Sequence, residues 1–217
     1  MIEKQTFNGR GSWLVGRTRG IGGSDAAAVL GLNPYMSNTE LWAIKTGRAK
    51  KADLSGNKLV EYGTRAEYHL RGIFELDFPE YRVEYEPFSI YTNSDYPWAC
   101  ASLDGRIFED STGRTGILEI KTATISGSAQ AAKWKDRIPD NYFCQILHYM
   151  AVMEADFSIL KAQLKYERPG DLLEVTKHFY IEWEDVREQA EYLMEQEKIF
   201  WQYVTTDKEP PLVLPEI

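Results

Sequence analysis

The nine residues TGILEIKTA, numbers 115–123, decide the fold of this chain and the chemistry that it can carry. The run is apolar and follows a glycine-containing turn at 112–116, which is typical of a strand next to the protein interior. Side chains two residues apart in a strand point to the same face. Glu119 and Lys121 therefore project together, while Ile120 faces the opposite way.

A second carboxylate precedes this strand. The stretch WACASLDGRIFED, residues 98–110, predicts two short strands around Asp104 and Gly105. Asp104 meets Glu119 and Lys121 if the strand after it pairs with residues 115–123 around the turn at 112–116. Two oxygen ligands and an ammonium group at one point suit metal-assisted phosphodiester hydrolysis, because Mg²⁺ prefers carboxylates and water and can activate a bound water.

The alternative is a Glu119–Lys121 ion pair on a solvated face, and for an isolated E-x-K tripeptide that is the commoner outcome. The apolar residues around this tripeptide favour an interior position, where unpaired charge is costly.

Two expected helices add polar side chains to this site. YGTRAEYHL, residues 62–70, places Gly63 and Glu67 one helical turn apart on one face. YFCQILHY, residues 142–149, places Gln145 and Tyr149 four residues apart in a helix expected from about 140 to 155. His148 points elsewhere on that helix, and we interpret it as a core or surface histidine outside the site.

A glycine-rich block, GRTRGIGGSDAAAVLGLNP at residues 16–34, precedes these segments. A glycine-rich turn that opens a helix often binds phosphate. A dinucleotide fingerprint is excluded, because Asp25 stands at the third glycine position and the preceding SWLVGRTR is too polar for a buried parallel strand. No G-K-[ST] of a P-loop follows. A tight turn before a helix capped by Ser24 or Asp25 is the simplest alternative, whereas Arg17 and Arg19 favour binding of another anion.

The composition indicates a globular protein. Of the 217 residues, 43% are hydrophobic and 27% charged, and no apolar run is long enough to span a membrane. The N-terminus lacks the apolar region of a secretory signal. Cys100 and Cys144 form no disulfide framework or metal motif, so we expect a reducing cytoplasm.

The net charge of −8 counts against nucleic acid as a partner, because affinity for DNA comes largely from neutralising phosphates. Binding depends on local patches, however, and an enzyme that holds metal ions needs carboxylates at its centre. Basic residues do cluster, in three groups: Arg10, Arg17 and Arg19; Arg48, Lys50 and Lys51; Lys133, Lys135 and Arg137.

The order of predicted elements indicates an α/β fold, with a central mixed β-sheet flanked by α-helices. We expect a single domain over residues 1–217, with a helical part at about 1–78, a sheet core at about 79–183, and a C-terminal helix and tail at about 184–217. Within the core, 81–92 is expected as one alternating strand. The strands 157–167 and 172–183 are expected to join at a turn containing Pro169 and Gly170.

The ordered motifs resemble the PD-(D/E)xK nuclease superfamily and, more narrowly, the phage lambda exonuclease family, also called YqaJ-type viral recombinases. The matching blocks run from about residue 12 to 155: SWLVGRTRGIGGSDAAAVLGLNPY, ELWAIKTGR, YGTRAEYHL, ASLDG, ILEIKTA and IPDNYFCQILHYMAV. The resemblance implies a restriction-endonuclease-like core. It also implies a Mg²⁺-dependent 5′→3′ exonuclease that releases mononucleotides from linear duplex DNA and leaves 3′ single-stranded tails for recombination.

The resemblance also implies residue roles at the metal site. Asp104, Glu119 and the Ile120 backbone carbonyl would be metal ligands, and Glu67 an accessory acid at or near a second metal ion. Lys121 would activate the water. The superfamily's proline–aspartate reads Leu103–Asp104 here, which leaves the role of the aspartate intact.

Three further residue roles follow from the same resemblance. Gln145 would support the catalytic site. Arg17 and Ser24, with the backbone amides of Gly22 and Gly23 between them, would hold the 5′-terminal phosphate of the DNA.

The implied cofactor is a pair of Mg²⁺ ions, with Mn²⁺ as a substitute, and the implied substrate is linear double-stranded DNA. The implied partners are a single-strand annealing protein and further copies of the chain in a trimeric ring, in a bacterial cytoplasm and of phage or prophage origin. Two alternatives are a DNA endonuclease of the same fold and a non-catalytic DNA-binding recombination scaffold. The block that contains Arg17, the glycines and Ser24 favours the exonuclease, because an endonuclease has no need to recognise a terminal phosphate.

Overall fold

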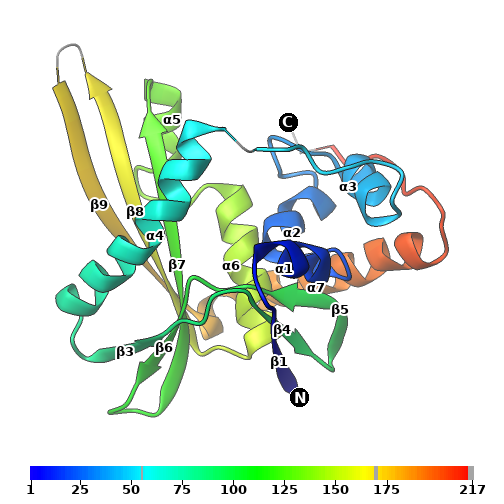
Figure 1. The fold of residues 1–217 in the computed structure, drawn as a ribbon, viewed down its shortest axis with the longest axis horizontal. Coiled ribbons are helices and arrows are strands. Elements are labelled where there is room, and N and C mark those ends of the chain that lie inside the picture. The colour runs from blue at the N-terminus through cyan, green and yellow to red at the C-terminus, as the bar shows by residue number, and fades with distance from the viewer. Residues whose placement is uncertain (55, 169–170, 215–217) are drawn as a thin grey trace.

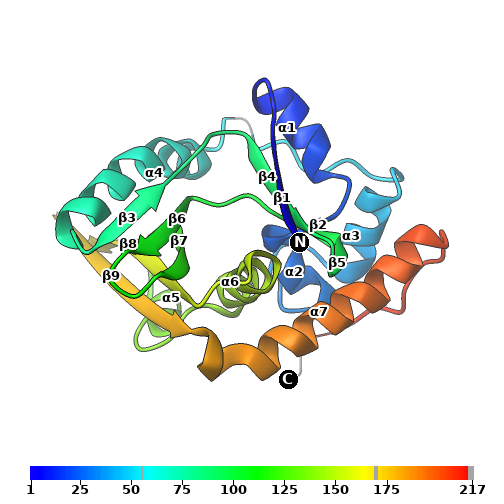
Figure 2. The ribbon, with the colours of Figure 1, turned by 90° about the horizontal axis from the view of Figure 1, so that it is seen from below.

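The protein is described by a computed structural model of residues 1–217, in which all residues are placed except 55, 169–170 and 215–217. Two mixed β-sheets lie side by side, and helices pack between and around them (Figure 1 and Figure 2). The turn predicted at Pro169 and Gly170, and the end of the tail, lie outside the described residues.

The larger sheet has five strands in the order β3 (Tyr81–Glu84), β6 (Gly105–Glu109), β7 (Arg114–Ile125), β8 (Phe157–Arg168) and β9 (Asp171–Glu182). Only β7 and β8 run parallel among these neighbours. The antiparallel pair β6–β7 aligns Gly105 with Leu118 and Glu109 with Arg114. The predicted pairing around the turn at 112–116 is therefore confirmed.

A second, four-stranded sheet has the order β1 (Ile2–Thr6), β4 (Ser89–Asn93), β5 (Tyr96–Ala101) and β2 (Ile21–Gly22). The sequence did not indicate β1 or the short β2, which pairs in parallel with β5. The expectation of one strand over 81–92 is wrong, because this segment divides into β3 and β4 in different sheets. Phe88 has a positive φ of 58° just before β4, and a backbone turn of this kind ends a continuous strand.

Seven helices complete the described part of the chain: α1 (Arg10–Arg17), α2 (Gly23–Val29), α3 (Asn38–Lys45), α4 (Lys58–Asp77), α5 (Ser128–Lys133), α6 (Asp140–Met153) and α7 (Trp183–Thr205). Helix α4 begins where the Asn57 side chain accepts hydrogen bonds from two backbone amides of the first turn. Helix α2 begins at an N-cap of Gly22 rather than at Ser24 or Asp25, although the Asp25 side chain does cap the helix by accepting a hydrogen bond from the Gly22 amide. Both side chains belong to its first turn.

Helix α6 occupies the centre of the molecule, where it contacts both sheets and packs against α2 and α7 (Figure 2). Strand β7 separates two hydrophobic clusters: Leu118 and Ile120 pack with α4, whereas Ile117 packs in the cluster that includes α6. This alternation follows from the strand period of two residues. The predicted class, a mixed sheet flanked by helices, is confirmed, and the second sheet is an addition to it. No helix of the described residues is long and apolar enough to cross a membrane.

Candidate active site

The E-x-K stretch of β7 faces α6. Glu119 is 1% exposed, and its Oε1 accepts hydrogen bonds from Lys121 Nζ and from Gln145 Nε2, the latter at 2.6 Å. Its other oxygen, Oε2, is buried and has no hydrogen-bond partner among the described residues. Gln145 also donates to the Tyr149 hydroxyl at 3.3 Å. The structure thus brings together Glu119, Lys121 and Gln145 of the predicted site. The Oε2 atom of Glu119 remains available to a ligand.

Asp104 joins this group from the connection between β5 and β6. Its Oδ2 accepts a hydrogen bond from Ile120 N at 2.9 Å, which fixes the carboxylate beside the residue between Glu119 and Lys121. The Asp104 carbonyl accepts from Arg71 Nε at 2.6 Å, and Arg71 stacks on the Tyr85 ring. Sequence reasoning missed Arg71, although it lies one helical turn after Glu67 on α4.

Burial and neighbouring carboxylates raise the pKa of Glu119 and of Glu67. Burial raises the pKa of Glu119 to about 8, the negative charge of Asp104 adds to this, and the Lys121 ammonium opposes it. Burial likewise raises the pKa of Glu67 to about 7, with Asp104 again contributing. For Lys121 burial lowers the pKa, but Glu119 and Asp104 outweigh burial and the net direction is upward. Part of each rise in pKa comes from a neighbouring carboxylate, and a nearby cation would oppose that part.

The oxygen donors of this site are of the kind that a hard divalent cation takes. Among the described residues, no three His, Cys, Asp or Glu side chains form a group that holds a metal ion by itself. Mg²⁺ is usually held by one or two carboxylates, with waters and substrate phosphates completing its shell. The unpartnered Oε2 of Glu119 and the adjacent Asp104 carboxylate supply such oxygens.

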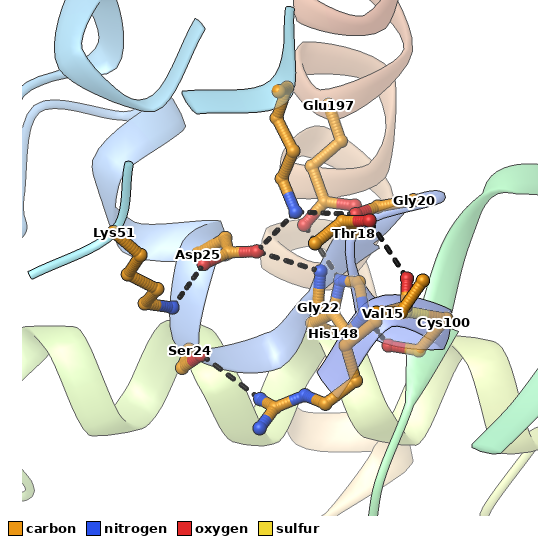
Figure 3. A network of polar contacts seen from close by, with 12 residues as sticks. Val15, Thr18, Gly20, Gly22, Ser24, Asp25, Lys51, Cys100, His148 and Glu197 are labelled. Carbon is orange, nitrogen blue, oxygen red and sulfur yellow. Dashed lines mark hydrogen bonds and ion pairs between the residues drawn. The ribbon is translucent and has the colours of Figure 1, made fainter. Parts of the chain in front are cut away.

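The glycine block forms a second polar group at the start of α2 (Figure 3). Arg17 Nη2 lies 3.3 Å from Ser24 Oγ and donates to it, so two residues of the predicted phosphate site lie side by side. The Arg17 guanidinium group stacks on Trp13, its carbon 4.7 Å from the ring centroid. The Trp13 indole donates to Ser102 Oγ at 3.2 Å, two residues before Asp104.

Asp25 turns inward and shapes the glycine block. Its Oδ2 accepts from Gly22 N at 3.2 Å and from Lys45 Nζ at 2.8 Å, and Lys45 also donates to the Gly20 carbonyl at 2.6 Å. Burial raises the pKa of Asp25, but Lys45 and Lys51 outweigh it and lower the pKa to about 2. The Gly22 amide is thus engaged by a carboxylate, so the predicted phosphate site has fewer amides to offer.

His148 is a core residue of α6 that makes no contact with the carboxylate site among its hydrogen bonds. It is fully buried, its Nδ1 lies 2.8 Å from Glu197 Oε1 of α7, and its Nε2 lies 3.0 Å from the Cys100 carbonyl of β5. Because a carbonyl only accepts, Nε2 carries a proton. His148 therefore ties α6 to α7 and to the strand that pairs with β2, outside the site.

This fold is that of phage-type exonucleases. The structure resembles an alkaline exonuclease from Laribacter hongkongensis, with a TM-score of 0.64, 15% identity, and coverage of 91% of this chain and 94% of that one. It also resembles a phage-related exonuclease from Haemophilus somnus 129PT, with a TM-score of 0.55, 11% identity, and coverage of 87% and 96%.

The chain belongs to the family of the YqaJ-like viral recombinase domain, whose model matches residues 12–156. The family predicted from the motifs is therefore confirmed. The chain is 30% identical over 197 residues to the uncharacterized protein YqaJ of Bacillus subtilis (strain 168). This match covers 85% of the chain and 59% of that relative, so the chain spans less than two thirds of the relative's length.

Proposed function

We propose that the protein is a Mg²⁺-dependent DNA exonuclease that degrades one strand of linear duplex DNA from its 5′ end. The observation that carries the proposal is that two polar groups, the carboxylate site of β7 and the glycine block at the start of α2, both pack against one helix, α6. Gln145 of α6 holds Glu119, and a Cβ atom on Gly23 would lie 3.0 Å from Gln145 Cγ. A site for a scissile phosphate and a site for a terminal phosphate therefore have a fixed separation.

Glu119 and Asp104 would hold the metal ion, with Mn²⁺ as a substitute for Mg²⁺, and the ion would activate water and stabilise phosphoryl charge. Lys121 has a raised pKa and is an ammonium group in the free protein. It donates a hydrogen bond to the attacking water or a phosphate oxygen and offsets negative charge that grows in the transition state. Gln145 orients Glu119, and Glu67 adds an accessory acid from α4.

The family and the structural relatives support this activity. The Laribacter hongkongensis exonuclease is also known in complex with dAMP, at a TM-score of 0.62 and 16% identity. A mononucleotide bound to a protein of this fold supports stepwise release of mononucleotides. The Arg17–Ser24 pair supports recognition of a DNA end, for which an endonuclease of the same fold has no use.

The partners belong to the same proposal. An exonuclease that leaves 3′ single-stranded tails serves recombination when a single-strand annealing protein coats them. We place the protein in the bacterial cytoplasm, with a phage or prophage origin. A trimeric ring around DNA would keep the enzyme on its substrate, and solution mass with and without duplex DNA tests it.

Digestion of matched linear and circular duplexes with Mg²⁺ tests the activity. Mononucleotides released from the linear form alone, and abolished by a chelator, are expected. Nicking of circles would identify an endonuclease instead. Retention of DNA without cleavage of either form would identify a binding scaffold.

A further inference from the structure

The basic cluster Arg48, Lys50 and Lys51 has no role in the proposed chemistry so far. The structure separates its members. Arg48 makes two hydrogen bonds to Asp207, at 2.6 and 2.9 Å, and stacks on Trp42, so it joins α3 to the end of α7. Lys51 instead reaches the glycine block, where its Nζ lies 3.2 Å from Asp25 Oδ1.

Lys51 is a surplus cation at this position. Asp25 already has a buried partner in Lys45, whose side chain is 4% exposed and whose Nζ lies 2.8 Å away. It accepts a further hydrogen bond from the Gly22 amide. With Arg17 beside Ser24, three cations lie near the Asp25 carboxylate, while the neighbouring carboxylate of Glu197 is paired with His148. The positive charge of Arg17, Lys45 and Lys51 favours the binding of an anion at this position.

Of the two partners in the Lys51–Asp25 ion pair, the Lys51 side chain is the more exposed and is free to turn toward a ligand. It is 60% exposed, whereas the Asp25 side chain is 7% exposed. An ion pair with one exposed partner contributes little and is screened by salt, so exchanging it costs little. Figure 3 shows the Lys51 ammonium group pointing at the start of α2, where Ser24 accepts from Arg17.

We propose that Lys51 is a specificity-determining residue that binds the 5′-terminal phosphate together with Arg17 and Ser24. The inference rests on the proposed function. A terminal phosphate monoester carries up to two negative charges and three acceptor oxygens, whereas a phosphodiester carries one charge. The lysine ammonium group is a compact charge with three rotatable donors, so it binds the more highly charged terminal phosphate more strongly than a phosphodiester. Asp25 stays neutralised by Lys45 when Lys51 leaves it.

Lys51→Gln tests the assignment, and Lys50→Gln, an exposed neighbour on the same segment, is the matched control. Binding of 5′-phosphorylated and 5′-hydroxyl duplexes is measured by fluorescence anisotropy in Ca²⁺, and their cleavage rates in Mg²⁺. We expect Lys51→Gln to weaken binding of the phosphorylated end about tenfold, the scale of one charge-assisted hydrogen bond. Binding of the hydroxyl end should stay unchanged, and Lys50→Gln should leave both as in the wild type.

The outcomes separate this inference from the proposed function. A wild-type preference for phosphate that persists in Lys51→Gln overturns the inference and leaves the exonuclease intact. Equal weakening of both ends, or equal effects in the Lys50→Gln control, also overturns it, because a general electrostatic or structural role would act so. If the wild-type protein is an exonuclease without any preference for a 5′-phosphate, the proposed terminal-phosphate site is wrong, and so is the role of Lys51 in it.

Discussion

Gly23 of α2 lies directly against the ring of Tyr149 in α6. A Cβ atom at Gly23 would lie 2.5 Å from Tyr149 Cε1 and 2.7 Å from Cζ, closer than real carbon contacts. Tyr149 is 2% exposed and accepts a hydrogen bond from Gln145, which holds Glu119. Glycine is therefore needed here for close approach of two helices. Through this contact the glycine block is fixed relative to the carboxylate site.

Gly23→Ala is expected to push Tyr149 and Gln145 away from their places. Overpacking of a buried contact typically costs about 1–3 kcal/mol. Cleavage should fall by more than this stability loss explains, because Gln145 no longer orients Glu119. Urea unfolding measures the first effect, and the cleavage rate of the folded variant measures the second.

Gly72→Ala is the control for the Gly23 substitution. Gly72 lies within α4, and a Cβ atom there would meet nothing within 4 Å. Alanine in a helix interior is favoured over glycine by about 1 kcal/mol, so this variant should be as stable as the wild type or more so. A Gly23→Ala protein with wild-type stability and rate would contradict the packing argument.

Lys121→Ala is expected to abolish cleavage while DNA binding remains. The substitution removes a donor aimed at charge that develops in the transition state, and loss of one such donor costs about 10²–10³-fold in rate. Glu119 keeps its hydrogen bond from Gln145, so the buried carboxylate still has a hydrogen-bond donor in the variant. Single-turnover cleavage and anisotropy on the same duplex separate the two effects. Turnover near the wild-type rate would remove Lys121 from the proposed chemistry.

Arg17→Ala is expected to reduce the preference for 5′-phosphorylated over 5′-hydroxyl ends. Arg17 donates to Ser24 Oγ and stacks on Trp13, so its guanidinium group is held at the start of α2. Loss of a charge-assisted contact should lower binding of the phosphorylated end by about tenfold or more. Competition between the two labelled duplexes measures the ratio directly. An unchanged ratio would argue that the terminal phosphate binds elsewhere.

Local pattern was sufficient to predict the centre of the site. The two-residue period of a strand placed Glu119 and Lys121 together and Ile120 opposite, and the helical period placed Gln145 with Tyr149. The structure shows Glu119 held by Lys121 and Gln145, with Ile120 in the cluster beneath α4. These contacts depend on periods that the sequence displays directly.

Contacts between distant segments were not predictable in this way. Strand β1 has a mostly exposed pattern and exists because it pairs with the distant strand β4, where Ile2 aligns with Asn93 and Thr6 with Ser89. Asp25 has the sequence of a helix cap, yet its partners Lys45 and Lys51 come from later segments. Arg71 contacts a backbone carbonyl, that of Asp104, and such an acceptor leaves no signal in a sequence.

Asp25 makes the stability of the protein depend on acid pH. Its pKa of about 2 in the folded protein lies below the ordinary value of 3.8, because Lys45 and Lys51 outweigh the effect of burial. A lowered pKa contributes stability that is present above pH 3.8 and lost as the pH falls toward 2. The difference corresponds to about 2 kcal/mol at neutral pH, of which about half is gone at pH 3.

Asp25→Asn should remove this contribution and leave Lys45 buried without its carboxylate, at a cost of about 3–5 kcal/mol near pH 7. Urea unfolding of both proteins at pH 7, 5 and 3 gives the difference in the free energy of unfolding. That difference should shrink at pH 3. A difference that is constant from pH 7 to 3 would show that the Asp25 carboxylate titrates as in an unfolded chain.

The His148–Glu197 pair should make the stability of the protein fall as the pH rises above neutrality, the opposite of the effect of Asp25. Burial lowers the pKa of His148, but Glu197 and the Cys100 carbonyl outweigh burial and raise it above 6.5. A raised pKa contributes stability that is fully present below pH 6.5 and lost as the pH rises through the folded-state value. Glu197→Gln removes the charged partner of a fully buried imidazolium, which should cost about 3–5 kcal/mol at pH 6 and progressively less at higher pH.

The matched control is Glu195→Gln on the same helix, where the side chain is 58% exposed and pairs with Lys198 at 3.5 Å. This control should change stability by less than about 0.5 kcal/mol at every pH. Urea unfolding from pH 6 to 9 measures both variants, and a Glu197→Gln cost that does not decline with pH would mean that His148 is neutral in the folded protein.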